Sequence, residues 1–144
     1  MPGAVWWAAL GLVTSLLLTG CAGGDPPPPT SSTASAAPAR PITAPDDGLL
    51  LGSFGFRNGP IGAFSLPRTT IFTALADQPA NVSAVIASPS TPEVFDYLQR
   101  TLPPAGFTIV RADRAAGSMT FAGPGWTGSF TGDERACAVV LRPT

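Results

Sequence analysis

The stretch that decides the fold is residues 90–107, which read STPEVFDYLQRTLPPAGF. Ser90 and Glu93 have the spacing of a capping box; alternatively, Thr91 is the N-cap and Pro92 occupies the first helical position. A stripe of apolar residues then recurs at helical spacing, at Val94, Phe95, Leu98 and Leu102. The two prolines and the glycine at 103–106 end the pattern. This stretch therefore predicts one amphipathic helix.

Short runs of apolar residues separated by turn residues lie on both sides of this helix. Before it, we expect one hairpin within 49–66 that turns at Asn58-Gly59, where a type I′ turn needs a positive φ at both central residues. We expect a second hairpin that joins 69–75 to 82–87. After it, we expect four strands, at 107–110, 119–122, 126–131 and 137–141. The predicted fold is α+β: a small antiparallel sheet of about five to seven strands with one main helix packed on one face.

Trp126 lies in the most conspicuous motif of the C-terminal part, GPGWTGSF at 123–130. An exposed Trp126 could bind a sugar or a peptide. Strand alternation, however, places Trp126, Gly128 and Phe130 on one face, so we expect Trp126 to belong to the core. Tyr97, beside the apolar stripe of the helix, is similarly ambiguous. Trp126 and Tyr97 are thus the candidate ligand-binding residues, and the ligand is unknown.

The N-terminal segment carries no charged side chain up to residue 24, and 5–18 form an apolar run of the length found in signal peptides. The run leads into Leu18, Thr19, Gly20 and Cys21. These four residues resemble the lipobox of bacterial lipoproteins. The resemblance implies cleavage between Gly20 and Cys21, an S-diacylglycerol group on the Cys21 thiol, and acylation of its amino group.

Alternatives remain open at this end of the chain. Signal peptides normally begin with Lys or Arg, and here neither precedes the apolar run, so either the true start lies upstream of Met1 or the signal peptide is an inefficient one. The stretch is almost long enough for an uncleaved transmembrane anchor, which needs about 20 residues, and plain secretion is a further alternative. Cys21 could also form a disulfide with Cys137. We instead expect Cys137 to be an unpaired, buried thiol, because its neighbours at 136–141 are apolar.

Composition divides the chain into three parts. Residues 1–20 form the signal peptide, and 21–47 comprise the lipidated Cys21 and a tether rich in Pro, Ser and Thr, in which little could bury a core. Residues 48–144 form the folded head. Its segments SLP (65–67), VFDYL (94–98), LPPAGF (102–107) and GWTGSF (125–130) resemble small exported domains of high-GC Gram-positive, mycobacterial-like bacteria. Most such proteins have no assigned function, so the resemblance bears on topology alone.

The chain lacks the residue types on which most enzymes depend, since it contains no His and no Lys. Imidazole acid–base chemistry, Schiff bases and a structural zinc site are therefore excluded, and we predict no catalytic residues, metal or cofactor. The carboxylate pairs Glu93–Asp96 and Asp133–Glu134 are better explained by a helix cap and an acidic turn. Eight scattered arginines and a net charge of −1 argue against nucleic-acid binding.

Two functions fit these observations. The first is a lipoprotein anchored in the cell membrane by its lipid, with a non-catalytic interaction module on the extracytoplasmic side that binds an envelope protein or the wall. The second is an extracytoplasmic carrier of an apolar or lipid ligand, held in a cavity between helix and sheet. A cavity of about 300 Å³ or more would favour the carrier, and a solid core would favour the interaction module.

Overall fold

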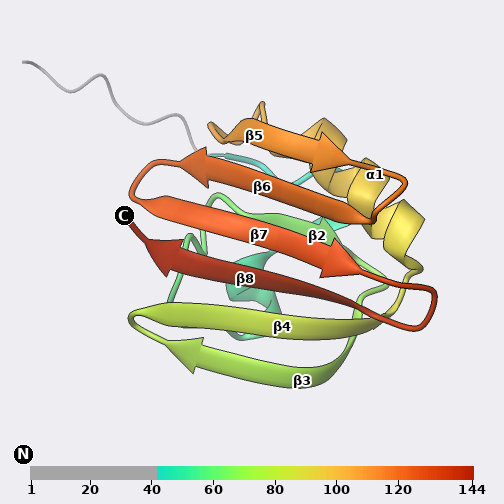
Figure 1. Cartoon of the computed structure of the whole chain (residues 1–144). Coiled ribbons are helices and arrows are strands. Elements are labelled where there is room, and N and C mark those ends of the chain that lie inside the picture. The colour runs from blue at the N-terminus through green and yellow to red at the C-terminus, as the bar shows by residue number, and fades with distance from the viewer. Residues whose placement is uncertain (1–41) are drawn as a thin grey trace, which may run out of the picture. The chain divides into compact units, whose positions relative to one another are not determined.

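The computed structural model describes residues 42–144, which contain one α-helix and two antiparallel sheets (Figure 1). The large sheet has six strands in the order β3-β4-β8-β7-β6-β5, and the small sheet pairs β1 with β2. The predicted α+β fold is confirmed. The elements are β1 (Gly48–Leu50), the 3₁₀ helix η1 (Leu51–Phe54), β2 (Ser65–Pro67), β3 (Ile71–Gln78), β4 (Asn81–Ser88), α1 (Thr91–Thr101), β5 (Thr108–Asp113), β6 (Ser118–Gly123), β7 (Trp126–Gly132) and β8 (Cys137–Pro143).

The predicted signal peptide, the lipobox residues Gly20 and Cys21, and the tether as far as residue 41 lie outside the described residues. Within residues 42–144, no helix is long and apolar enough to cross a membrane. The last residues assigned to the tether, 42–47, contact the head: Ile42 packs against the core, and the Gly48 N–H donates to the Pro45 carbonyl at 2.9 Å. Folded structure therefore extends at least six residues upstream of the predicted boundary.

Helix α1 begins as its sequence predicts. Ser90 is the N-cap, and its N–H and hydroxyl both donate to Oε2 of Glu93, at 2.9 and 2.6 Å. Thr91, the alternative cap, is the first helical residue, and its hydroxyl donates to the Asp133 carbonyl. This bond ties the start of the helix to the β7–β8 turn. The helix ends before the two prolines that follow Leu102.

The hairpin expected at Asn58-Gly59 is wrong. β1 and β2 do pair, with Leu49 opposite Leu66, but η1 and an irregular loop lie between them. Gly59 has the positive φ (85°) that its turn signal predicts. The N–H groups of Arg57 and Asn58, however, donate to the Asp77 carboxylate of β3, at 2.8 and 3.0 Å. A long-range carboxylate thus stabilises this loop in place of a neighbouring strand.

The other strands form within three residues of their predicted bounds, and β3 and β5 each end three residues later than predicted. The two residues 79–80 join β3 to β4, and β5, β6, β7 and β8 follow the helix. β8 returns to lie between β4 and β7, with Val85 opposite Ala138 and Phe130 opposite Val139. This insertion brings the C-terminal strand to the middle of the sheet.

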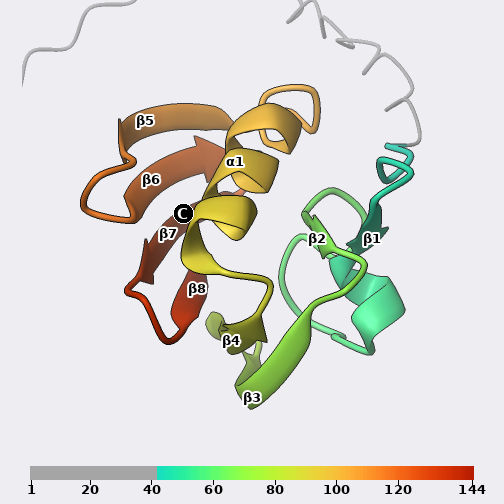
Figure 2. The same ribbon diagram turned by 90° about the vertical axis from the view of Figure 1, so that its right-hand side faces the viewer.

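One face of the large sheet is covered by two separate pieces, α1 and the β1–η1–β2 unit, as Figure 2 shows. Aromatic rings fill the space beneath them. The rings of Phe64 and Phe121 are stacked with their centroids 5.8 Å apart, and the centroid of Phe95 lies 6.2 Å from that of the fully buried Phe130. Trp126 is partly buried and packs against this core, as strand alternation predicts.

Cys137 also faces the core, with 2 % of its surface exposed, and its thiol is free. Burial raises the pKa of this thiol to about 11. The expectation of a buried, unpaired Cys137 is confirmed, and its raised pKa makes it a poor nucleophile at neutral pH.

Candidate functional site: the α1 groove

A groove of about 630 Å³ follows the exposed side of α1 where the helix faces the segments 46–47 and 67–69, and we call it the α1 groove. Its helical wall consists of side chains spaced three and four residues apart, which share one face of α1. They are Glu93, Asp96, Tyr97 and Arg100. The groove is open to solvent, and its lining is both polar and apolar.

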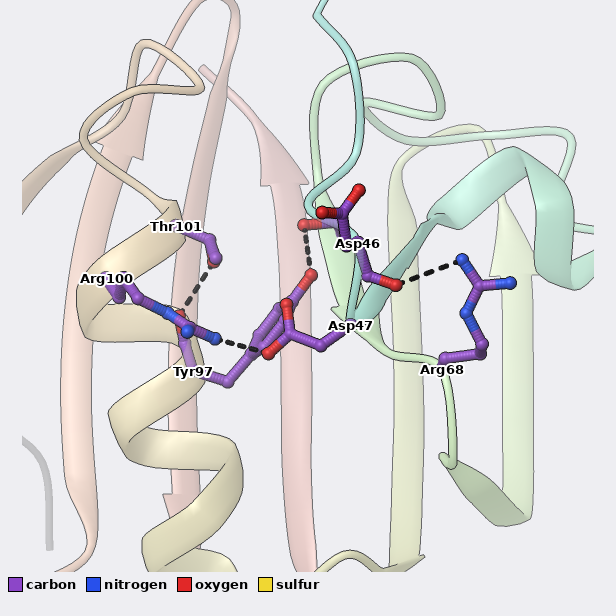
Figure 3. Close-up of polar contacts among 7 residues, drawn as sticks. Asp46, Asp47, Arg68, Tyr97, Arg100 and Thr101 are labelled. Atoms are coloured by element: carbon purple, nitrogen blue, oxygen red, sulfur yellow. Dashed lines mark hydrogen bonds and ion pairs between the residues drawn. The ribbon is translucent and has the colours of Figure 1, made fainter.

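The opposite wall is made by residues far from α1 in sequence. The pairing of β1 with β2 brings Asp47 beside Arg68, whose N–H donates to the Asp47 carbonyl at 2.9 Å. The Arg68 guanidinium also donates from Nη2 to the Asp46 carbonyl at 3.2 Å (Figure 3). Two backbone carbonyls therefore hold Arg68 at the rim of the groove.

Tyr97 is almost completely buried, at 4 % exposure, beside the seam between α1 and the small sheet. Its hydroxyl donates to Oγ of Ser65 in β2 at 2.8 Å. Burial raises the pKa of the Tyr97 hydroxyl, although the bond to Ser65 opposes this effect. Tyr97 thus lines the groove, but its polar atom is already engaged in linking the helix to β2.

Ion pairs neutralise part of the charge in the groove. Arg100 pairs with Asp47 at 2.6 Å and lies over the Tyr97 ring, 5.5 Å from its centroid. Asp96 is bound by both Nε and Nη2 of Arg114, and the first of these hydrogen bonds spans 2.8 Å. Both pairs are well exposed, so each stabilises the fold by about 0–1 kcal/mol. They matter mainly because they define which charges remain unpaired.

Three charged groups of the lining take part in neither ion pair. Within the described part of the chain, no hydrogen bond reaches the carboxylate of Asp46. Glu93 uses only Oε2 for the helix cap, and these bonds from Ser90 lower the pKa of its carboxyl. Arg68 uses Nη2 alone. Two carboxylates and one guanidinium can therefore bind a ligand.

Of the carboxylate pairs noted in the sequence, Glu93, Asp96 and Asp133 accept hydrogen bonds. Hydrogen bonds from Arg114 lower the pKa of Asp96, and backbone N–H groups of Arg135 and Ala136 lower that of Asp133. Across residues 42–144, no group of three or more His, Cys, Asp or Glu side chains is placed to hold a metal ion.

The structure separates the two predicted ligand-binding candidates. Tyr97 lines the groove, whereas Trp126 packs against the core on β7 and does not line it. Sequence reasoning missed Asp46, Asp47 and Arg68 as site residues. The helical half had a detectable signal, because Glu93, Asp96 and Arg100 form a polar stripe at helical spacing.

The groove also differs from the cavity that an apolar carrier would need. Aromatic rings pack the space between α1 and the large sheet, and the groove is open and bordered by charged side chains. Its volume exceeds the threshold of about 300 Å³, but its position and polarity suit a polar ligand.

Comparisons with known protein families, with curated protein sequences and with solved structures give no match to this chain.

Proposed function

We propose that this chain is a lipoprotein anchored in the bacterial cell membrane through Cys21, and that its head is a non-catalytic interaction module on the extracytoplasmic side. The observation that carries the interaction role is the α1 groove, which combines unpaired charges at Asp46, Glu93 and Arg68 with an open shape. The partner is an envelope protein or a component of the wall.

Several features support a binding role over catalysis. The chain has no imidazole, and its one described thiol is buried with a raised pKa. The Tyr97 hydroxyl is hydrogen-bonded to Ser65, and the Asp96 carboxylate is held by Arg114. A nucleophile next to a free general base is the arrangement that covalent catalysis needs, and these groups do not supply it.

The anchor is tested by metabolic labelling with an alkyne analogue of palmitate. We expect the wild type to be labelled and Cys21→Ala to lose the label. Cys137→Ala is the matched control, because it removes the other cysteine of the chain and should be labelled normally. Equal labelling of wild type and Cys21→Ala would rule out the lipid anchor.

The groove is tested by a photo-crosslinking amino acid in intact cells. Thr69 is exposed in the groove lining, and Thr120 is exposed on β6 outside it, so the two positions are matched in residue type. We expect a discrete adduct from position 69 and none from position 120. No adduct from position 69, or the same adduct from both positions, would contradict a binding role for the groove.

A further inference from the structure

We infer that the α1 groove binds an extended peptide segment that carries an Arg or Lys side chain. This inference rests on the proposed function and names the chemistry of the partner. The groove lining contains four of the eight Asp and Glu residues among 42–144, but only two of the seven arginines. The groove is therefore the part of the head where acidic side chains concentrate.

The unpaired groups define what the partner must supply. Because Asp47 and Asp96 already bind arginines, the carboxylates open to a ligand are those of Asp46 and Glu93. A guanidinium or ammonium group is their natural partner. Arg68 keeps Nε and Nη1 available, and these groups can donate to the backbone carbonyls of a peptide.

The shape favours a peptide segment over a small free cation. A volume of about 630 Å³ lies within the usual range of about 300–1,000 Å³ for ligand pockets, and an isolated ion would fill little of it. Pro89, which is partly exposed, adds apolar surface to the lining, against which the aliphatic stem of Arg or Lys can pack. An open groove also allows the segment to continue beyond it.

The experiment measures binding of labelled peptides to the full-length chain in detergent micelles by fluorescence anisotropy. The probe is acetyl-Gly-Gly-Arg-Gly-Gly-amide, and its control carries citrulline, which keeps the shape of arginine but lacks the charge. We expect the arginine peptide to bind at least about fivefold more tightly at low ionic strength, since one exposed charge pair at about 4 Å contributes a factor of about five in water. Salt should reduce the difference.

Two double variants locate the binding. Asp46→Asn with Glu93→Gln removes both open carboxylates, and Gln at the third helical position retains the capping box. The control, Asp113→Asn with Glu134→Gln, removes the same number of negative charges, but from residues that do not line the groove. We expect the first variant to abolish the preference for arginine and the second to retain it. Equal binding of the two peptides to the wild type, or equal loss in both variants, would overturn the inference.

The crosslink from position 69 separates this inference from the proposed function. An adduct that persists unchanged when Asp46 and Glu93 are neutralised would overturn the inference and leave the groove as an interaction site. An adduct lost in that variant and kept in the Asp113, Glu134 control would support the inference. Without any adduct in the wild type, the proposed function itself would fail.

Discussion

Replacing Gly48 with alanine should disturb the seam between α1 and the small sheet. Gly48 begins β1 and is buried against Tyr97. A Cβ atom at this position would overlap the Tyr97 hydroxyl oxygen and lie 2.8 Å from Cζ of the same ring. Tyr97 is 4 % exposed and bonded to Ser65, so its ring cannot move without losing that bond.

The expected cost follows from two effects. Forcing a methyl group into a packed site costs about 1–3 kcal/mol. Losing the Tyr97–Ser65 hydrogen bond leaves buried hydroxyls unpaired, which adds about 1 kcal/mol or more. We therefore expect Gly48→Ala to lower the free energy of unfolding by about 2–4 kcal/mol, a large share of the roughly 5–15 kcal/mol typical of a domain.

Tyr97→Phe provides the decisive comparison, because it removes the overlapping oxygen. Alone, Tyr97→Phe should cost about 1 kcal/mol, since it leaves Ser65 without its donor. In the Gly48→Ala background it should restore part of the lost stability. The four proteins form a double-mutant cycle, and we expect a coupling energy of at least about 1 kcal/mol.

The assay is urea unfolding of the full-length chain followed by far-UV circular dichroism. Gly62→Ala is the matched control, because a Cβ at Gly62 would meet nothing within 4 Å. We expect that control to lie within about 0.5 kcal/mol of the wild type. If Gly48→Ala costs the same with Tyr or Phe at position 97, the overlap with the Tyr97 hydroxyl is not the cause of the lost stability.

Three further predictions test the cap, the thiol and the core. Ser90→Ala should cost about 1 kcal/mol at neutral pH. Because the folded state lowers the Glu93 pKa, this stabilisation is present above pH 4.5 and is lost as the pH falls through the pKa of the folded state. The same cost of Ser90→Ala in urea unfolding at pH 3 and at neutral pH would contradict this prediction. In Cys21→Ala protein, Cys137, with its pKa raised to about 11, should react with Ellman's reagent at pH 8 only after unfolding; rapid reaction of folded protein would show that the thiol is accessible. Phe130→Ala should lower the free energy of unfolding, measured with urea, by about 3–5 kcal/mol, whereas Thr131→Ala, at an exposed position, should change it by no more than about 0.5 kcal/mol. Similar costs for the two substitutions would contradict the burial of Phe130.

Half of the candidate site could be predicted from the sequence. Glu93, Asp96 and Arg100 lie on one side of α1 because helical spacing alone places them there. Asp46 and Arg68 are 22 residues apart and join them only when β1 pairs with β2. No periodicity within either segment encodes that meeting.

The Asn58-Gly59 hairpin shows the same limit within the fold. The local signal correctly predicted a positive φ at Gly59, since this depends on the residue itself. Whether strands flank such a turn depends on what else can bind its backbone. Here the Asp77 carboxylate, 19 residues from Asn58, takes that role.

By itself, the sequence determined where the helix begins and roughly where most strands lie, because capping and side-chain periodicity act over a few residues. It also determined that Phe130 and Cys137 face the core. Only the tertiary structure decided the strand order, with β8 between β4 and β7, and the meeting of the two walls of the α1 groove. Such pairings join distant segments, and their stability comes from packing that forms only when the whole head folds.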